Sequence, residues 1–212
     1  MSNKKLIIFD FDGTIADTIE LARQISNELA TEFSYNQISP DEVLAYRSET
    51  SQGAIKKAGI SLLKLPFIAI RFKQLFAERL PNMTPIQDIF VALQEVKQAG
   101  FELGIVTSNS KKGVQAFLEK NNFAQFFSFI RASSSIFGKS RLVNEAIKAS
   151  GIEKKQVVYI GDETRDIEAA RSSKIAIIAV TWGFNTKERL ISEKPDYMID
   201  TPSELLDLLQ KI

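Results

Sequence analysis

Short apolar runs alternate with segments of helical periodicity along most of this 212-residue chain. The runs are strand-sized and apolar throughout, which is typical of parallel strands that are buried on both faces. They lie at residues 6–9, 103–107, 126–130, 157–160, 175–180 and, as a short edge strand, 197–199. Strands that alternate with helices in this way predict an α/β fold with an open, mostly parallel sheet and helices on both of its faces.

Helical patterns fill the intervals between these runs. Leu21, Ile25 and Leu29 recur every four residues in a helix that we expect to reach Phe33. Later helices are expected at residues 86–99, 114–120, 142–149 and, after a cap at Ser203, up to Leu209.

The pattern from Pro40 to Leu80 is helical and contains no convincing strand. Phe72 and Phe76 are four residues apart in this stretch, and we expect both to face a core. The segment 81–85, with a proline at each end, then breaks the chain. A chain of this length suits one domain, or a core domain with a smaller insert.

Composition restricts the classes of function. Hydrophobic residues make up 44% of the chain and its net charge is +1, as in an ordinary soluble globular protein. Basic residues occur in scattered pairs such as Lys56–Lys57 and Lys111–Lys112, so we expect no nucleic-acid partner. No apolar run is long enough to span a membrane, and no signal-peptide pattern opens the sequence, which predicts a cytoplasmic protein. The sequence leaves the oligomeric state open.

The chain contains no cysteine and no histidine. The first absence excludes disulfides, a thiolate nucleophile and a thiolate zinc site. The second excludes a serine–histidine triad and an imidazole base. An enzyme with this composition works with carboxylates, lysine, hydroxyl groups and a hard metal ion such as Mg²⁺.

Two acids, Asp10 and Asp12, follow the first strand directly, in the segment FDFDGTI of residues 9–15. Alternate residues of an extended chain project to the same side, so both carboxylates can face one site. There they repel each other unless a cation or a proton is shared between them. A polar turn is the alternative interpretation, whereas an EF-hand is excluded because its later acid, glycine and glutamate are missing.

Other strand ends carry polar groups as well. Thr107, Ser108 and Asn109 end the second strand, where a hydroxyl and backbone amides can hold a phosphate oxygen or cap the next helix. Lys139 lies at the start of a later helix, but Ser133 stands where a P-loop needs its first glycine. Lys139 is therefore interpreted as a single positive charge at the N-terminal end of a helix. The alternative is a solvated lysine with no role in a site.

A second acidic motif, GDETRD, covers residues 161–166 after the strand at 157–160. Asp162 ends that strand and Asp166 lies one helical turn later, so both can face the same point. A helix start with acids that favour its dipole is the alternative, but it does not require three acids. Because ligands of open α/β sheets bind beyond the carboxyl ends of the strands, these polar strand ends predict an active site there.

In their order, DxDGT, a hydroxyl after a strand, a lysine and GDxxxD resemble the motifs of the haloacid dehalogenase superfamily. The resemblance covers nearly the whole chain. More narrowly, the chain is similar to phosphoglycolate phosphatase-like members, which residues 180–185 and 194–197 also resemble. The resemblance implies a Rossmann-like core of residues 1–15 and 84–212, with a helical cap of residues 16–83 inserted after the first motif.

The resemblance also implies catalytic roles for a phosphatase that acts on a small phosphorylated metabolite. Asp10 would be the nucleophile and form an aspartyl-phosphate, and Asp12 would act as acid and then as base. Thr107 and the backbone amide of Ser108 would hold phosphate oxygens, while Lys139 would offset the charge of the transition state.

Mg²⁺ is the implied cofactor. Its ligands would be the carboxylates of Asp10 and Asp162 and the backbone carbonyl of Asp12. Asp166 would orient the water ligands of the metal, with Glu163 as a further candidate. Glu163 is a departure from the family pattern, since a small hydroxyl residue is common at that position.

Asn109 in the core and Arg47 in the cap are expected to bind the substrate. A solvated surface position is the alternative for Arg47, as it is for the nearby Lys56 and Arg71. Two other functions stay open at this point. One is a sugar-phosphate mutase, whose relatives use a cap histidine that this chain lacks, and the other is a non-catalytic phosphometabolite-binding or regulatory protein of the same fold.

Overall fold

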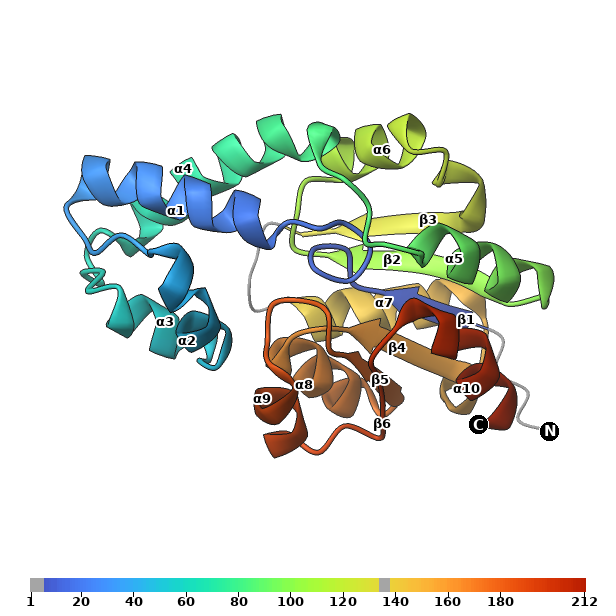
Figure 1. Ribbon diagram of the computed structural model, residues 1–212. Coiled ribbons are helices and arrows are strands. Elements are labelled where there is room, and N and C mark those ends of the chain that lie inside the picture. The colour runs from blue at the N-terminus through green and yellow to red at the C-terminus, as the bar shows by residue number, and fades with distance from the viewer. Residues whose placement is uncertain (1–5, 134–137) are drawn as a thin grey trace.

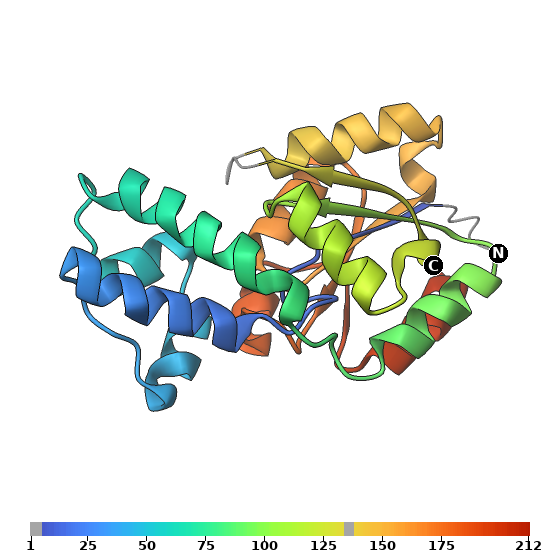
Figure 2. The ribbon, with the colours of Figure 1, turned by 90° about the horizontal axis from the view of Figure 1, so that it is seen from above.

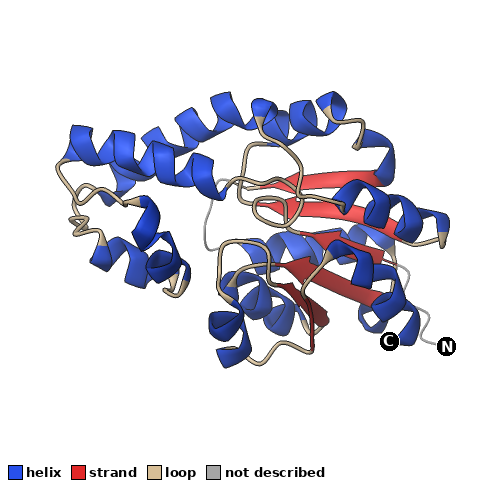
Figure 3. Ribbon diagram, viewed as in Figure 1, coloured by secondary structure: helices blue, strands red, loops and turns tan. Residues whose placement is uncertain are grey.

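A computed structural model describes residues 6–133 and 138–212 of the chain. Within these residues, six parallel strands form one sheet in the spatial order β3-β2-β1-β4-β5-β6 (Figures 1 and 3). The strands are β1 Leu6–Phe9, β2 Glu102–Thr107, β3 Phe127–Ala132, β4 Val157–Gly161, β5 Ala176–Val180 and β6 Tyr197–Ile199. The apolar runs thus form strands of a buried parallel sheet, and the predicted fold class is confirmed.

Helices return the chain from the end of one strand to the start of the next. They are α5 Ile89–Gln98, α6 Lys111–Lys120, α7 Lys139–Ser150, α8 Thr164–Ser173 and α9 Lys187–Ser192, whereas α10 Leu205–Lys211 follows the last strand, β6. The expected cap at Ser203 is wrong: Thr201 begins a short 3₁₀ turn, Pro202–Glu204, and the Glu204 carboxylate accepts a hydrogen bond from the Thr201 amide at 2.8 Å. No helix in the two described ranges is long and apolar enough to cross a membrane.

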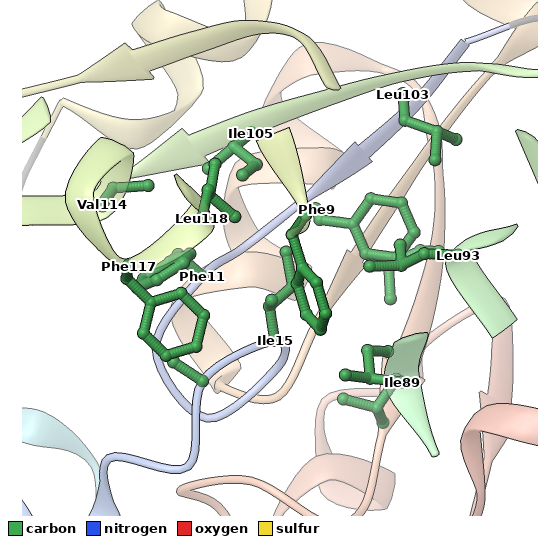
Figure 4. Close-up of a cluster of buried hydrophobic side chains, with 14 of the residues drawn as sticks. Phe9, Phe11, Ile15, Ile89, Leu93, Leu103, Ile105, Val114, Phe117 and Leu118 are labelled. Carbon is green, nitrogen blue, oxygen red and sulfur yellow. The ribbon is translucent and has the colours of Figure 1, made fainter. Parts of the chain in front are cut away.

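Alternate residues of each strand point to opposite faces of the sheet and build two cores. Ile7 and Phe9 belong to the core under α5, α6 and α10, part of which is shown in Figure 4. Leu6 and Ile8 belong to the core under α7, α8 and α9. The sheet is therefore covered by helices on both faces. These helices leave the carboxyl ends of the strands uncovered.

The α-helices between β1 and β2 that precede α5, which we call the cap helices, lie beyond the carboxyl ends of the strands (Figures 1 and 2). They are α1 Ile19–Phe33, α2 Val43–Arg47, α3 Ser51–Lys57 and α4 Leu65–Arg79. Phe76 of α4 is buried as expected, and the half-buried ring of Phe72 stacks on it with centroids 5.5 Å apart. The division of the chain at residues 16–83 stays a prediction.

We expect Phe117→Ala to lower the free energy of unfolding by about 3–5 kcal/mol. Phe117 of α6 is fully buried and meets Phe11 edge-to-face, with ring centroids 5.1 Å apart, so its removal leaves a cavity beside the loop after β1. The control, Phe67→Ala, removes the same ring from a side chain of α4 that is 64% exposed, and its cost should stay below about 1 kcal/mol. Urea denaturation measures both, and equal losses would contradict this packing.

Candidate active site

The polar residues of the sequence motifs converge at the carboxyl ends of three neighbouring strands. Asp10 follows β1, Thr107 is the last residue of β2, and Asp162 follows β4. Asp166 lies in the first turn of α8, and Lys139 is the first residue of α7. These strands are adjacent in the order β2-β1-β4, so residues far apart in the sequence meet at one point.

A buried cluster of charges forms the centre of the site. Asp10, Asp162 and Asp166 each offer a carboxylate oxygen, and these oxygens all lie within 4.8 Å of one another. Lys139 joins them: its Nζ lies 2.8 Å from Asp10 Oδ2 and 2.5 Å from Asp166 Oδ1. The four side chains are almost inaccessible to solvent. Three carboxylates therefore share a single ammonium, and an all-oxygen set of this kind fits a hard divalent cation.

Backbone and hydroxyl donors fix the Asp162 carboxylate. Thr14 Oγ1 donates to Oδ1 at 2.5 Å, and the backbone amide of Phe184 donates to Oδ2 at 2.6 Å. The chain passes so close that a Cβ on Gly13 would lie 2.3 Å from Asp162 Oδ2, and a Cβ on Gly183 would lie 2.2 Å from the Asp162 side chain. Both positions therefore require glycine, and Gly13 also has a φ of +75°.

Asp12 stands apart from the acidic cluster. Its carboxylate accepts hydrogen bonds from Asn109 Nδ2, at 3.2 Å to Oδ1 and 3.3 Å to Oδ2. The Asn109 backbone amide in turn donates to Thr107 Oγ1 at 3.0 Å. Ser108 lies between these two residues and is half-buried, and Ser110 caps α6 by accepting from the amide of Gly113 at 3.1 Å. The polar end of β2 thus both caps a helix and holds Asp12 toward the site.

Burial dominates the ionisation of these acids. It raises the pKa of Asp10 to about 7, against the opposing charge of Lys139, and the pKa of Asp12 to about 6, against the hydrogen bond from Asn109. Burial likewise raises the pKa of Asp162 well above its ordinary value. Burial also acts against the charge of Lys139, but the neighbouring carboxylates outweigh it and hold its pKa well above the usual range. Lys139 therefore keeps its proton, while Asp10, Asp12 and Asp162 hold protons more readily than exposed aspartates do.

Glu163 forms an ion pair with a residue that the sequence analysis did not single out. The guanidinium of Arg165 donates through Nε and Nη2 to the two carboxylate oxygens of Glu163. Burial acts to raise the pKa of Glu163, but the charge of Arg165 outweighs it, and the pKa lies below its ordinary value. Among the described residues, the acidic cluster does not include Glu163. The two residues are only two positions apart, a spacing that does not predict a side-chain pair on a helix, so the sequence gives no signal for this ion pair.

A cavity of about 270 Å³ lies among the cap helices and is bordered by three residues of the core, but no residue of the acidic cluster lines it. Arg23 and Arg47 line it from the cap helices, and Glu163 and Phe184 line it from the core. Arg47 also reaches the core directly: its Nη2 donates to the carbonyl of Gly183 at 2.6 Å, and its Nε donates to the carbonyl of Phe184 at 3.2 Å. The structure thus places Arg47 beside the cavity and in contact with the loop that holds Asp162.

Comparison with known proteins places this geometry in a family. A family model described as haloacid dehalogenase-like hydrolase matches residues 7–180. A phosphoglycolate phosphatase of Synechococcus elongatus is 32% identical over 206 residues, which cover 97% of each protein. A pyrophosphatase PpaX of Bacillus mycoides is 26% identical over 212 residues, again 97% of each. The crystal structure of a predicted phosphatase from Clostridium acetobutylicum, 20% identical, superposes with a TM-score of 0.86 over the full length of both chains.

The raised pKa values predict how pH changes the stability of the metal-free protein. An unfolded aspartate has a pKa of about 4. Between about pH 4 and pH 7 the folded protein therefore holds more protons on Asp10 and Asp12 than the unfolded chain does, and stability falls as the pH rises through this range. Asp10→Asn removes one ionisable group, so we expect its melting temperature at pH 8 with a chelator to exceed that of the parent by roughly 5 °C or more.

The same variant should lose this advantage toward pH 4, where the folded parent is protonated at Asp10. Thermal unfolding with EDTA across this pH range measures the difference. Asp41→Asn, the same substitution at an exposed carboxylate, serves as the control and should follow the parent at every pH. A parent that is as stable as Asp10→Asn at pH 8 would show that burial does not disfavour the charge of Asp10.

Proposed function

This chain belongs to the haloacid dehalogenase-like hydrolases, and we propose that it is a Mg²⁺-dependent phosphatase acting on a small organic phosphate monoester through an aspartyl-phosphate intermediate. The observation that carries the proposal is the buried cluster of Asp10, Asp162 and Asp166 around the single ammonium of Lys139. A carboxylate nucleophile, a place for a divalent cation and a fixed positive charge are the parts that phosphoryl transfer through an aspartate needs.

The cluster would hold the metal through the carboxylates of Asp10 and Asp162 and the backbone carbonyl of Asp12. Asp166 would orient its water ligands, a role that fits its contact with Lys139 and its acceptance of the Glu163 amide at 3.0 Å. When bound, Mg²⁺ supplies the positive charge that lets the dianionic phosphate approach a group of acids. The Asp12 side chain is not proposed as a metal ligand, because its carboxylate accepts hydrogen bonds from Asn109.

Asp10 would attack phosphorus in line with the leaving alcohol. A bond forms between an Asp10 carboxylate oxygen and phosphorus, and the bond from phosphorus to the ester oxygen breaks. The proton on Asp12 passes to the departing oxygen, so that the alcohol leaves neutral. A water molecule then attacks phosphorus and gives a proton to Asp12. The bond between the Asp10 oxygen and phosphorus breaks, so that inorganic phosphate leaves and the Asp10 carboxylate is restored. Lys139, 2.8 Å from Asp10 Oδ2, offsets the negative charge that develops.

Asp12 is suited to both proton transfers. Burial raises its pKa to about 6, close enough to neutrality for the group to give and take a proton under ordinary conditions. The hydrogen bonds from Asn109 hold its orientation, so we propose that Asn109 acts on the reaction through Asp12 in addition to binding the substrate. Thr107 Oγ1 and the Ser108 amide would hold the phosphate oxygens at the end of β2.

The cavity between the cap helices and the core suits a small anionic organophosphate. Relatives of this chain are named a phosphoglycolate phosphatase and a pyrophosphatase, and the substrate in each name carries a second anionic group beside the phosphate that is removed. Arg47 lines the cavity and offers positive charge to such a group, whereas the guanidinium of Arg23 forms an ion pair with Glu20 at 2.7 Å. We propose a phosphoglycolate-like metabolite as the substrate. The cytoplasmic location stays a prediction, as does the absence of a nucleic-acid partner.

We expect Asp10→Asn to lower phosphate release by at least about a thousandfold, because the amide is nearly isosteric with the carboxylate but is a poor nucleophile. Phosphate release from a panel of small phosphate esters, phosphoglycolate included, is measured with Mg²⁺ and with a chelator. Asp41→Asn, at an exposed position in the turn Pro40–Glu42 between α1 and α2, is the matched control and should retain the parent rate.

Metal-dependent release that is lost in Asp10→Asn supports the phosphatase, and the order of the esters defines the preference of the cavity. Release that persists in Asp10→Asn removes the nucleophilic role of this residue. A folded parent that binds Mg²⁺ and releases phosphate from no ester contradicts the proposal and favours the mutase or the binding protein.

A further inference from the structure

Asn185 occupies a junction between the core and the cap helices. It follows β5 in the loop 181–186 and is 7% exposed. Its Oδ1 accepts a hydrogen bond from the backbone amide of Thr164 at 2.9 Å, at the start of α8. Its Nδ2 donates to the backbone carbonyls of Arg47 at 2.9 Å and Glu49 at 3.1 Å, in the link between α2 and α3. One buried amide thus joins three segments.

The backbone amides of Phe184 and Asn185 hold Asp162, one through its carboxylate and the other through its backbone carbonyl. The Phe184 amide donates to Asp162 Oδ2 at 2.6 Å, and the Asn185 amide donates to the Asp162 carbonyl at 3.2 Å. The same short loop that fixes Asp162 is therefore the one that contacts the cap helices. A displacement of the cap helices at this point acts directly on the support of Asp162.

Arg47 makes the reciprocal contact from the cap side. Its guanidinium donates to the carbonyls of Gly183 and Phe184, and its own carbonyl also accepts from the Thr186 amide at 3.1 Å. Arg47, Phe184 and Asn185 all line the 270 Å³ cavity. The residues that join the cap helices to the loop 181–186 therefore also border the cavity.

We propose that Asn185 is a positioning residue that, together with Arg47, fixes the cap helices over the active site in register with Asp162. The chemistry of the side chain explains the choice of residue: the junction presents two carbonyl acceptors and one amide donor, and a carboxamide satisfies all three. An aspartate would satisfy Thr164 but would set a carboxylate oxygen about 3 Å from two carbonyl oxygens, so the contact with the cap helices becomes repulsive. The role in turnover rests on the proposed function, whereas the role in placing the cap helices does not.

A distance measurement separates this proposal from a purely local role in starting α8. The chain has no cysteine, so Leu63→Cys beside α4 and Val91→Cys on α5 give two unique sites for spin labels. Both side chains are exposed, at 86% and 53%. Pulsed electron–electron double resonance then measures the distance between the two labels, and so between the cap helices and the core. Asn185→Asp keeps the bond to Thr164 and removes both donors to the cap helices.

We expect Asn185→Asp to shift or broaden the distance distribution relative to the doubly labelled parent, with cooperative unfolding retained. Asn121→Asp is the matched control: it makes the same change of charge and loses one bond from Nδ2 to the Phe117 carbonyl, within α6 and the residue that follows it. Its distribution should match the parent. An unchanged distribution in folded Asn185→Asp overturns the proposal.

Arg47→Ala provides a second, independent test if the buried charge in Asn185→Asp prevents folding. It removes the two guanidinium bonds to the core from a side chain that is only half-buried, and it should shift the same distance. An unchanged distance in Arg47→Ala then overturns the proposal. In the kinetic assay, the loss of fixed cap helices should raise KM at least tenfold for esters that the parent hydrolyses, while an inactive parent would count against the proposed function alone.

Discussion

Three buried carboxylates share one ammonium at the carboxyl edge of the sheet, and the rest of the site depends on this imbalance of charge. Asp10, Asp162 and Asp166 each place a carboxylate oxygen within 4.8 Å of the others, so negative charge on them is mutually unfavourable. Burial raises the pKa of Asp10 to about 7 even with Lys139 2.8 Å away, and the nearby charges of Asp166 and Asp12 act in the same direction. In the proposed mechanism, a metal ion would offset this repulsion and would also supply the positive charge that the reaction needs.

The fold supplies this arrangement by simple means. Parallel strands end at one edge, and the central position of β1 between β2 and β4 brings three loops together there. Gly13, after β1, and Gly183, in the loop after β5, then let the chain approach Asp162 more closely than any side chain would permit. The Phe184 amide binds the Asp162 carboxylate, and the Phe184 carbonyl accepts a hydrogen bond from the Arg47 guanidinium. The support of Asp162 and the placement of the cap helices are therefore linked.

Much of this was predictable from local patterns, and the exceptions are contacts between distant segments. The apolar runs predicted the sheet because strands buried on both faces carry a clear signal, and the motifs around Asp10 and Asp162 predicted which strand ends matter. The contact between Asn185 and Arg47 joins residues 138 positions apart, which no periodicity reveals. Ser203 was misassigned as a cap because Thr201, two residues earlier, offers the same hydroxyl and pairs with Glu204.

The most direct test of the account is calorimetric titration of Mg²⁺ into the metal-free protein. The charge imbalance predicts one ion bound per chain, with an affinity that rises from pH 5 to pH 8 as Asp10 and its neighbours lose their protons. Asp162→Asn should weaken this binding at least tenfold, because it removes one carboxylate from the cluster. A folded protein that binds no Mg²⁺, or binding that Asp162→Asn leaves unchanged, would contradict the account.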